Sequence, residues 1–305
     1  PPPPPPPPPP LIPQPATTEI YTNAESSAAS DVYKRQALIP PQLAERLQKV
    51  LARAGHGSRR QVESWIREGR ITVNDKPAEI GISVSATDKI RLDGKAVSIA
   101  ATSDAPRTLL YHKPAGELTT RKDEAGRPTV FDNLPRIQNS RWISVGRLDF
   151  NTAGLLLVTT DGELAHRLMH PSWEVEREYA VRVLGKVDDE TLQRLQQGVM
   201  LDDGMASFES LLDAGGAGAN HWYHVMLREG KNREVRRLWE SQGLKVSRLI
   251  RIRYGPIELA RDVRAGRYRD LNDKELASLY ALVKLAPPKP VEKKRPPVKR
   301  GRRRR

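Results

Sequence analysis

Residues 145–157, with the sequence VGRLDFNTAGLLL, place a short polar loop between two apolar stretches. Gly146 and Gly154 bracket this loop, and we expect them to permit close backbone approach on both of its sides. Apolar runs of this length, bounded by turn residues, favour buried strands. The segment therefore predicts two strands joined by a loop that presents the carboxylate of Asp149 to a substrate.

A carboxylate in such a loop has two interpretations. It can be a turn or cap residue, as we expect for Asp203 and Asp262, or it can carry covalent or acid/base chemistry. The neighbours favour chemistry, because Arg147 can engage a phosphate. We also expect Asn151 and Thr152 to hold the loop through side-chain to backbone hydrogen bonds.

Composition excludes several classes of protein. The 305 residues are 38% hydrophobic, which suits two ordinary domains, and the absence of cysteine excludes disulfides, thiolate zinc sites and a thiol nucleophile. Of the six histidines, only the pairs His166/His170 and His221/His224 have ligand-like spacing, and neither belongs to a recognisable metal motif. No apolar run reaches the length of a membrane span and no signal peptide is evident. We therefore expect a soluble, cytoplasmic protein that binds neither a metal nor a membrane.

The two ends of the chain differ from the rest. Residues 1–36 begin with ten prolines, continue into a stretch that resembles a translated sequencing adaptor, and precede the first methionine, Met169. We predict a non-native or disordered leader without function; a natural proline-rich tail is the alternative. At the other end, residues 284–305 contain eleven Lys or Arg and one Glu, so residues 286–305 are expected to form a disordered basic tail.

Residues 43–98 predict a small basic module. Apolar residues at helical spacing indicate two helices, and Ser58 with Gln61 forms a capping-box pattern at the start of the second. Strands are predicted at 71–73 and 90–92, each followed by a turn signal. The helices carry more cations than a solvated face requires, which favours phosphate contact. The predicted RNA-binding residues are Arg46, Lys49, Arg53, Arg59, Arg60, Arg67 and Arg70.

The sequence of this segment, RLQKVLARAGHGSRRQVESWIREGRITVNDK, resembles the S4 RNA-binding domain. A linker at 99–106 then leads to a second domain at 107–285, in which strands and helices rarely alternate strictly. This order predicts an α+β fold with a mixed or antiparallel sheet. Strands are expected at 108–112, 142–145, 155–159, 178–184, 207–212, 222–227 and 246–254, and helices at 162–169, 188–197, 233–242 and 273–285.

Two further segments of the second domain carry polar residues of interest. Residues 229–237 place four cations at a predicted helix start, an arrangement that suits a phosphate or a buried carboxylate. Tyr179 lies at the start of a predicted strand, where it is either an ordinary core residue or a platform for a base.

Several motifs, in order, identify a family. GRLDFNTAGLLLVTTDG, HKPAGE, EREYAVRV and EGKNREVRRL, behind an S4-like module, resemble the RsuA family of pseudouridine synthases over residues 43–285. The resemblance implies an isomerase that breaks the bond between uracil N1 and ribose C1′ and rejoins the base through C5, with no cofactor or metal. It also implies a catalytic set of Asp149 as nucleophile, Tyr179 stacked on the flipped base, and Arg236 paired with the aspartate.

The resemblance leaves some choices open. Asp149 adds either to C1′ or to uracil C6. Arg147 is expected at the backbone phosphate, Leu249 either under the base or in the ordinary core, and Lys113 with Pro114 in a structural role. The implied partner of a monomeric protein is ribosomal RNA, with a specific uridine of 23S rRNA as the substrate. The alternatives are another rRNA uridine, or a non-catalytic S4-type factor in ribosome assembly.

Overall fold

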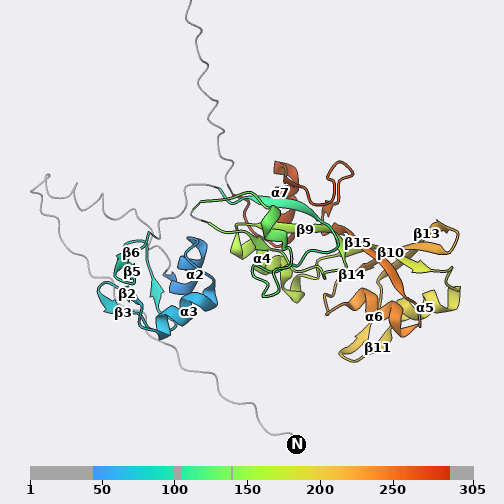
Figure 1. Ribbon diagram of the computed structural model, residues 1–305, viewed down its shortest axis with the longest axis horizontal. Helices are drawn as coiled ribbons and strands as arrows, with labels where there is room; N and C mark the ends of the chain where they lie inside the picture. The colour runs from blue at the N-terminus through green and yellow to red at the C-terminus, as the bar shows by residue number, and fades with distance from the viewer. Residues whose placement is uncertain (1–43, 99–104, 139, 289–305) are drawn as a thin grey trace, which may run out of the picture. The chain divides into compact units, whose positions relative to one another are not determined.

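The computed structural model describes residues 44–98, 105–138 and 140–288 (Figure 1). The leader predicted at 1–36, most of the linker at 99–106 and nearly all of the basic tail lie outside the described residues. None of the helices in the described ranges is long and apolar enough to cross a membrane.

Residues 45–96 form the module that the basic N-terminal segment predicts. Helix α2 (Leu47–Arg53) and helix α3 (Arg59–Arg67) are followed by a four-stranded sheet in the order β3-β2-β5-β6, and β1 (Glu45–Arg46) pairs with β4 (Ser83–Val84). The sheet strands are β2 (Ile71–Val73), β3 (Lys76–Pro77), β5 (Ile90–Leu92) and β6 (Lys95–Ala96).

Local chemistry explains this module. The Ser58 hydroxyl accepts from the Gln61 amide at 3.1 Å and the Gln61 side chain accepts from the Ser58 amide, which confirms the capping box. Asn74 and Asp75 both have positive φ, as a two-residue hairpin turn between β2 and β3 requires. The fully buried Leu47, Val62 and Ile71, among others, join the helices to the sheet.

The second domain is built on a nine-stranded mixed sheet in the order β13-β14-β10-β15-β9-β7-β17, with β16 paired to β15 and β8 paired to β9. All of its neighbouring strands are antiparallel except β15 and β9, which run parallel. The predicted mixed sheet is therefore confirmed. The strands are β7 (Thr108–Lys113), β8 (Ile143–Ser144), β9 (Ala153–Thr159), β10 (Arg177–Leu184), β13 (Ser210–Ala217), β14 (Asn220–Leu227), β15 (Val246–Tyr254), β16 (Ile257–Glu258) and β17 (Tyr268–Asp270).

Helices cover this sheet in two groups, which Figure 1 shows near its two ends. Helices α4 (Gly162–Met169) and α7 (Asp273–Leu282) pack with β7 and β9 around Leu110, Leu155 and Leu157. Helices α5 (Asp189–Gln197) and α6 (Glu234–Ser241) pack with β10 and β14 around Tyr223 and Trp239. The four predicted helices are thus confirmed, although α7 ends three residues earlier than expected.

Several short elements were not predicted. The hairpin of β11 (Val199–Leu201) and β12 (Gly204–Ala206), the strands β16 and β17, and the 3-10 helices η1 (Val130–Asn133) and η2 (Pro171–Trp173) contain two to four residues each. Elements this short contain too few residues to show a hydrophobic period.

Candidate active site

A cleft of about 860 Å³ opens where the Asp149 loop meets strands β10 and β15. Of the predicted site residues, it brings together Arg147, Asp149, Tyr179 and Leu249, but not Arg236. Its remaining lining comes from four places: the end of α4 and η2, the strands β10 and β15, the 227–235 segment, and the Asp149 loop itself. Those residues are Gly146, Leu148, Thr152, Met169, Pro171, Glu174, Arg177, Leu227, Arg228, Glu229, Gly230, Lys231, Asn232, Arg233, Glu234, Val235, Arg251 and Tyr254.

The loop that carries Asp149 is held by Lys113, whose side chain is fully buried. The Lys113 ammonium donates to the main-chain oxygens of Pro114 at 2.9 Å, Asp149 at 3.1 Å and Thr152 at 2.9 Å, with a longer contact to Phe150 at 3.4 Å. Burial lowers the pKa of Lys113 to about 8, and the charges of Glu117 and Asp149 oppose that shift. One ammonium therefore fixes the main chain at Asp149 and at the residues that follow it, up to Thr152.

Arg236 holds the same loop from helix α6. Its guanidinium donates to the oxygen of Asn151 at 2.9 Å and to the oxygen of Val246 at 3.0 Å, while its Nε is buried without a partner. Burial lowers the pKa of Arg236, and the nearby charge of Asp149 works against this shift. Within the described ranges, no ion pair shorter than 4 Å joins Arg236 to Asp149, so Arg236 contacts the loop's backbone and not its carboxylate.

Two expectations about the loop are wrong. The Thr152 hydroxyl is buried without a hydrogen-bond partner, and it is the Thr152 amide that closes the turn, by donating to the Asp149 oxygen at 3.0 Å. At Gly146, an added Cβ would meet nothing within 4 Å, so this glycine serves its positive φ of 77° and not a close approach. The loop is held by distant cations, which local sequence does not reveal.

Gly154 does require the close approach that the sequence predicts. A Cβ at this position would lie 2.3 Å from the main-chain oxygen of Arg251 and 2.5 Å from its nitrogen. Gly154 pairs with Lys113 of β7 on one side and with Arg251 of β15 on the other. The glycine thus allows the strand behind Asp149 to pack against the strand that forms the cleft floor.

A β-bulge shapes the floor of the cleft. The pairing of β10 with β15 skips Ile252, so that Tyr179 lies opposite Arg251 while Arg177 lies opposite Tyr254. Arg177 and Tyr179 are two apart on β10 and share a face of the sheet. Because of the bulge, their partners Arg251 and Tyr254 share that face too, and all four side chains line the cleft.

Arg251 was not predicted as a site residue. Its side chain is only 2% exposed, and its Nε donates to the Leu155 oxygen at 2.7 Å. The guanidinium lies 5.0 Å from the centre of the Tyr254 ring. In the described part of the chain it makes no other hydrogen bond and no ion pair within 4 Å, and its Nη2 is buried without a partner.

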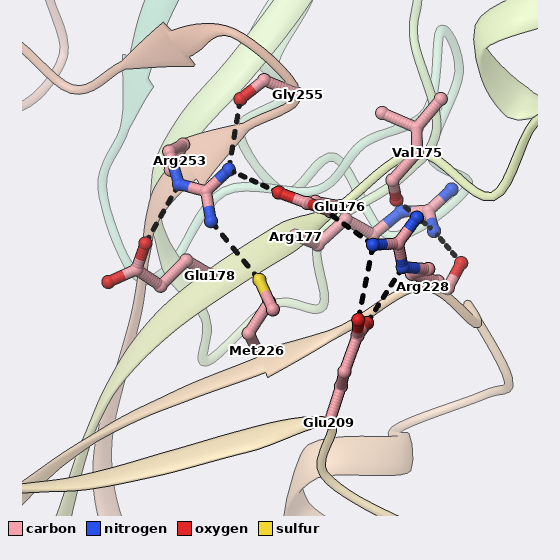
Figure 2. A network of polar contacts seen from close by, with 9 residues as sticks. All are labelled: Val175, Glu176, Arg177, Glu178, Glu209, Met226, Arg228, Arg253 and Gly255. Atoms are coloured by element: carbon pink, nitrogen blue, oxygen red, sulfur yellow. Dashed lines mark hydrogen bonds and ion pairs between the residues drawn. The ribbon is translucent and has the colours of Figure 1, made fainter.

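Three arginines in or beside the cleft form a different set of contacts, in which carboxylates neutralise two of them (Figure 2). Glu176 lies between two of them, accepting from Arg253 at 2.9 Å and from Arg228 at 2.9 Å. Arg228 also binds Glu209, and Arg253 binds Glu178. Arg177 is the exception, because its Nη1 donates to main-chain oxygens, including that of Val175 at 3.0 Å.

Of the four cations between residues 229 and 237, all except Arg236 are paired with carboxylates of the described chain. Lys231 pairs with Glu229, Arg233 with Glu240, and Arg237 with Asp203, which is thereby the structural carboxylate that we expected. The buried carboxylate here is Glu234, whose pKa burial raises and which accepts from the Lys231 amide at 3.0 Å. Arg147, on the cleft wall, is exposed and makes no ion pair within 4 Å among the described residues.

Some of the predicted RNA-binding residues of the N-terminal module have partners within the protein, and others have no carboxylate partner among the residues that the structure describes. Lys49 and Arg53 pair with Glu45, Arg70 pairs with Asp93 and Glu68, and Arg46 donates to the Gly81 oxygen. The predicted RNA-binding residues of α3, which are Arg59, Arg60 and Arg67, are exposed and have no carboxylate within 4 Å in the described ranges. These last three keep their charge available to a polyanion.

Candidate metal ligands do not gather at the cleft. Among the residues that the structure describes, no three side chains of His, Asp or Glu lie close enough together to hold a metal ion. Of the predicted pairs, His166 and His170 have ring centres 5.8 Å apart, and His221 contacts Asp213 at 2.5 Å.

Comparison with known proteins agrees with this architecture. Residues 107–241 match the family described as RNA pseudouridylate synthase, and residues 45–90 match the S4 domain. A crystal structure of a pseudouridylate synthase aligns with 77% of this chain and all of its own, with a TM-score of 0.55 at 24% identity, which supports the fold.

Three relatives described as ribosomal large subunit pseudouridine synthase B are much more similar. The chain is 57% identical to that of Pseudomonas aeruginosa over 80% of its length, but spans only 64% of that relative. It is 54% identical to that of Yersinia pestis, covering 84% of this chain and 83% of the relative, and 56% identical to that of Escherichia coli K12, covering 80% and 85%. The chain therefore belongs to the family of RNA pseudouridylate synthases, which are isomerases.

Proposed function

We propose that this protein isomerises a specific uridine of 23S rRNA to pseudouridine, with Asp149 as the nucleophile. The large-subunit substrate is suggested by the relatives, each described as a ribosomal large subunit pseudouridine synthase. The catalytic role rests on one observation. The only carboxylate of the GRLDFNTAG loop lines the cleft, and two buried cations hold the main chain of that loop in place.

The cleft geometry suits attack on a nucleotide that has left its stack. Tyr179 and Leu249 line the floor and offer an aromatic and an aliphatic surface to the base. Unstacking a base costs a few kcal/mol, and stacking on such a surface offsets part of that cost. Arg147 and Arg177, on the wall and floor, have no carboxylate partner within 4 Å in the described ranges and can meet the flanking phosphates.

The reaction changes two bonds to C1′. The N1–C1′ bond breaks, the base turns, and C5 forms the new bond to C1′; C5 loses its proton and N1 gains one, so the overall composition is unchanged. Asp149 attacks either C1′ or uracil C6. Tyr179, which we expect to stack on the base, would assist removal of the proton from C5.

Lys113 and Arg236 contribute by position. They bind the main-chain oxygens of Asp149, Asn151 and Thr152, so the loop is held before substrate arrives. A nucleophile positioned in this way requires little rearrangement to reach its target, and small misplacements are costly to rate. The N-terminal module would supply affinity for folded RNA through Arg59, Arg60 and Arg67.

The test uses 23S and 16S rRNA transcribed in vitro and therefore unmodified. After incubation with the protein, pseudouridines are mapped by a carbodiimide adduct that stops reverse transcription. We expect one new stop on 23S rRNA and none on 16S rRNA. A stop on 16S rRNA alone would overturn the proposed substrate, and no stop on either RNA would overturn the proposed activity.

A further inference from the structure

The buried guanidinium of Arg251 has far fewer partners than its five N–H donors require. It donates once, to the Leu155 oxygen, and its Nη2 is buried without any partner in the described chain. Leaving a buried charged donor unpaired costs free energy that most folds avoid. Arg228, which lines the cleft, and Arg253, which lies outside it, show the usual solution, since each binds two carboxylates.

Two features of the backbone around Arg251 determine where its side chain lies. Because Gly154 has no side chain, β9 can pack against the Arg251 backbone. The bulge at Ile252 puts Arg251 and Tyr254 on the face of the sheet that lines the cleft. The ring of Tyr254, itself 1% exposed, lies against the guanidinium, which restricts its orientation. A bulge that re-aims a side chain next to a reactive carboxylate is a feature of functional sites.

We propose that Arg251 binds the edge of the target uracil, donating a hydrogen bond to one of its two carbonyl oxygens. This inference rests on the proposed function. Arg251 pairs directly with Tyr179 across the strands and is two residues from Leu249, the two residues that we place against the base.

The burial of Arg251 favours the base, and not a backbone phosphate, as its ligand. At 2% exposure its guanidinium lies at the floor of the cleft, where a stacked base reaches. The backbone phosphates stay nearer the opening, which is served by the exposed Arg147. A cation at a uracil carbonyl also stabilises the negative charge that develops on the base as the N1–C1′ bond breaks.

The experiment is a cycle between protein variants and altered substrates. A stem-loop containing the mapped target is made with uridine, 2-thiouridine or 4-thiouridine at that position, since sulfur accepts hydrogen bonds weakly. Single-turnover rates are measured for the wild-type protein, Arg251→Met and Arg251→Gln, with thermal unfolding to establish that each variant folds. Arg253→Met is the matched control, because Arg253 is on the same strand, does not line the cleft and is bound by carboxylates.

We expect the single-turnover rate of the wild-type protein to be roughly tenfold lower on one of the two thio-substituted RNAs than on the other. In the Arg251 variants, which are slower on uridine by roughly 10- to 100-fold, that difference should disappear. Arg253→Met should keep it.

A uniform slowing by the Arg251 variants on all three RNAs, with the sulfur effect unchanged, would overturn the base contact while leaving the proposed function intact. Absence of pseudouridine with the wild-type protein on the uridine RNA would instead overturn the proposed function.

Discussion

The ammonium of Lys113 lies 3.1 Å from the main-chain oxygen of Asp149 and is fully buried beneath it. The nucleophile that we propose is therefore positioned through its own backbone, from a residue 36 positions earlier in the chain. Arg236 completes this support by binding the oxygen of Asn151 at 2.9 Å. Position, and not an ion pair to the carboxylate, is what these two cations supply.

Replacing Lys113 by Met should leave the Asp149 loop free to move. We expect pseudouridine formation to fall by roughly 100-fold, because misplacing a reacting group by about 1 Å has that effect. Single-turnover rates on the stem-loop measure it. Lys186→Met, at an exposed position, is the control and should retain the wild-type rate. Retained activity in Lys113→Met would contradict the role of this lysine.

The pKa of Lys113 also predicts how stability depends on pH. Below pH 8, Lys113 is charged in both the folded and the unfolded chain, and burial of that charge opposes folding. Between pH 8 and the ordinary value of 10.5, the unfolded chain binds a proton that the folded chain lacks, so the free energy of unfolding rises with pH.

Urea unfolding of the wild-type protein and Lys113→Met between pH 7 and pH 11, the range that spans this window, isolates the effect. The difference should shift in favour of the wild-type protein by up to roughly 3 kcal/mol across the window. A difference that stays constant with pH would mean that Lys113 keeps its charge when buried.

Gly154→Ala should disrupt the contact between β9 and β15, since its Cβ would lie 2.3 Å from the Arg251 oxygen at a backbone φ of 109°. We expect a loss of about 3 kcal/mol or more in unfolding free energy, measured by urea unfolding. Gly146→Ala is the matched control, because its Cβ meets nothing and only a positive φ opposes it. Its loss should stay near 1 kcal/mol. Equal losses at the two glycines would contradict the close approach.

Replacing Arg59 and Arg60 by Ala should weaken RNA binding without slowing the chemical step. Removing two phosphate contacts lowers the slope of log affinity against log salt by about 2. Filter binding across a salt series gives the slope, and single-turnover rates at saturating protein give the chemical step. Arg70→Ala, whose partner is Asp93, should change the slope less. An unchanged slope in the double variant would place the RNA elsewhere.

The sequence was sufficient to predict elements that carry their own signal. The seven strands and four helices predicted in the second domain all occur, because each has an apolar run or a helical period. The capping box of Ser58 is equally local. The grip on the Asp149 loop is not local: Lys113 and Arg236 reach it from another strand and another helix, and neither distance is encoded in a motif spacing.

Arg251 shows a second limit of sequence reasoning. In the stretch VSRLIRIRY, residues two apart share a face in a regular strand, which would put Arg251 beside Arg253. The bulge at Ile252 breaks that period and separates a buried cation of the cleft from one that carboxylates neutralise. Nothing in the residue types marks where the register slips.

The central claim is that Asp149 carries the chemistry, and release of tritium from RNA labelled at uracil C5 measures that chemistry directly. Asp149→Asn preserves the size of the side chain, and Asp203→Asn, a surface carboxylate paired with Arg237, is the matched control. We predict that the wild-type protein and Asp203→Asn release tritium at similar rates, whereas Asp149→Asn binds the RNA and releases none. Tritium release by Asp149→Asn at a rate close to that of the wild-type protein would contradict the account.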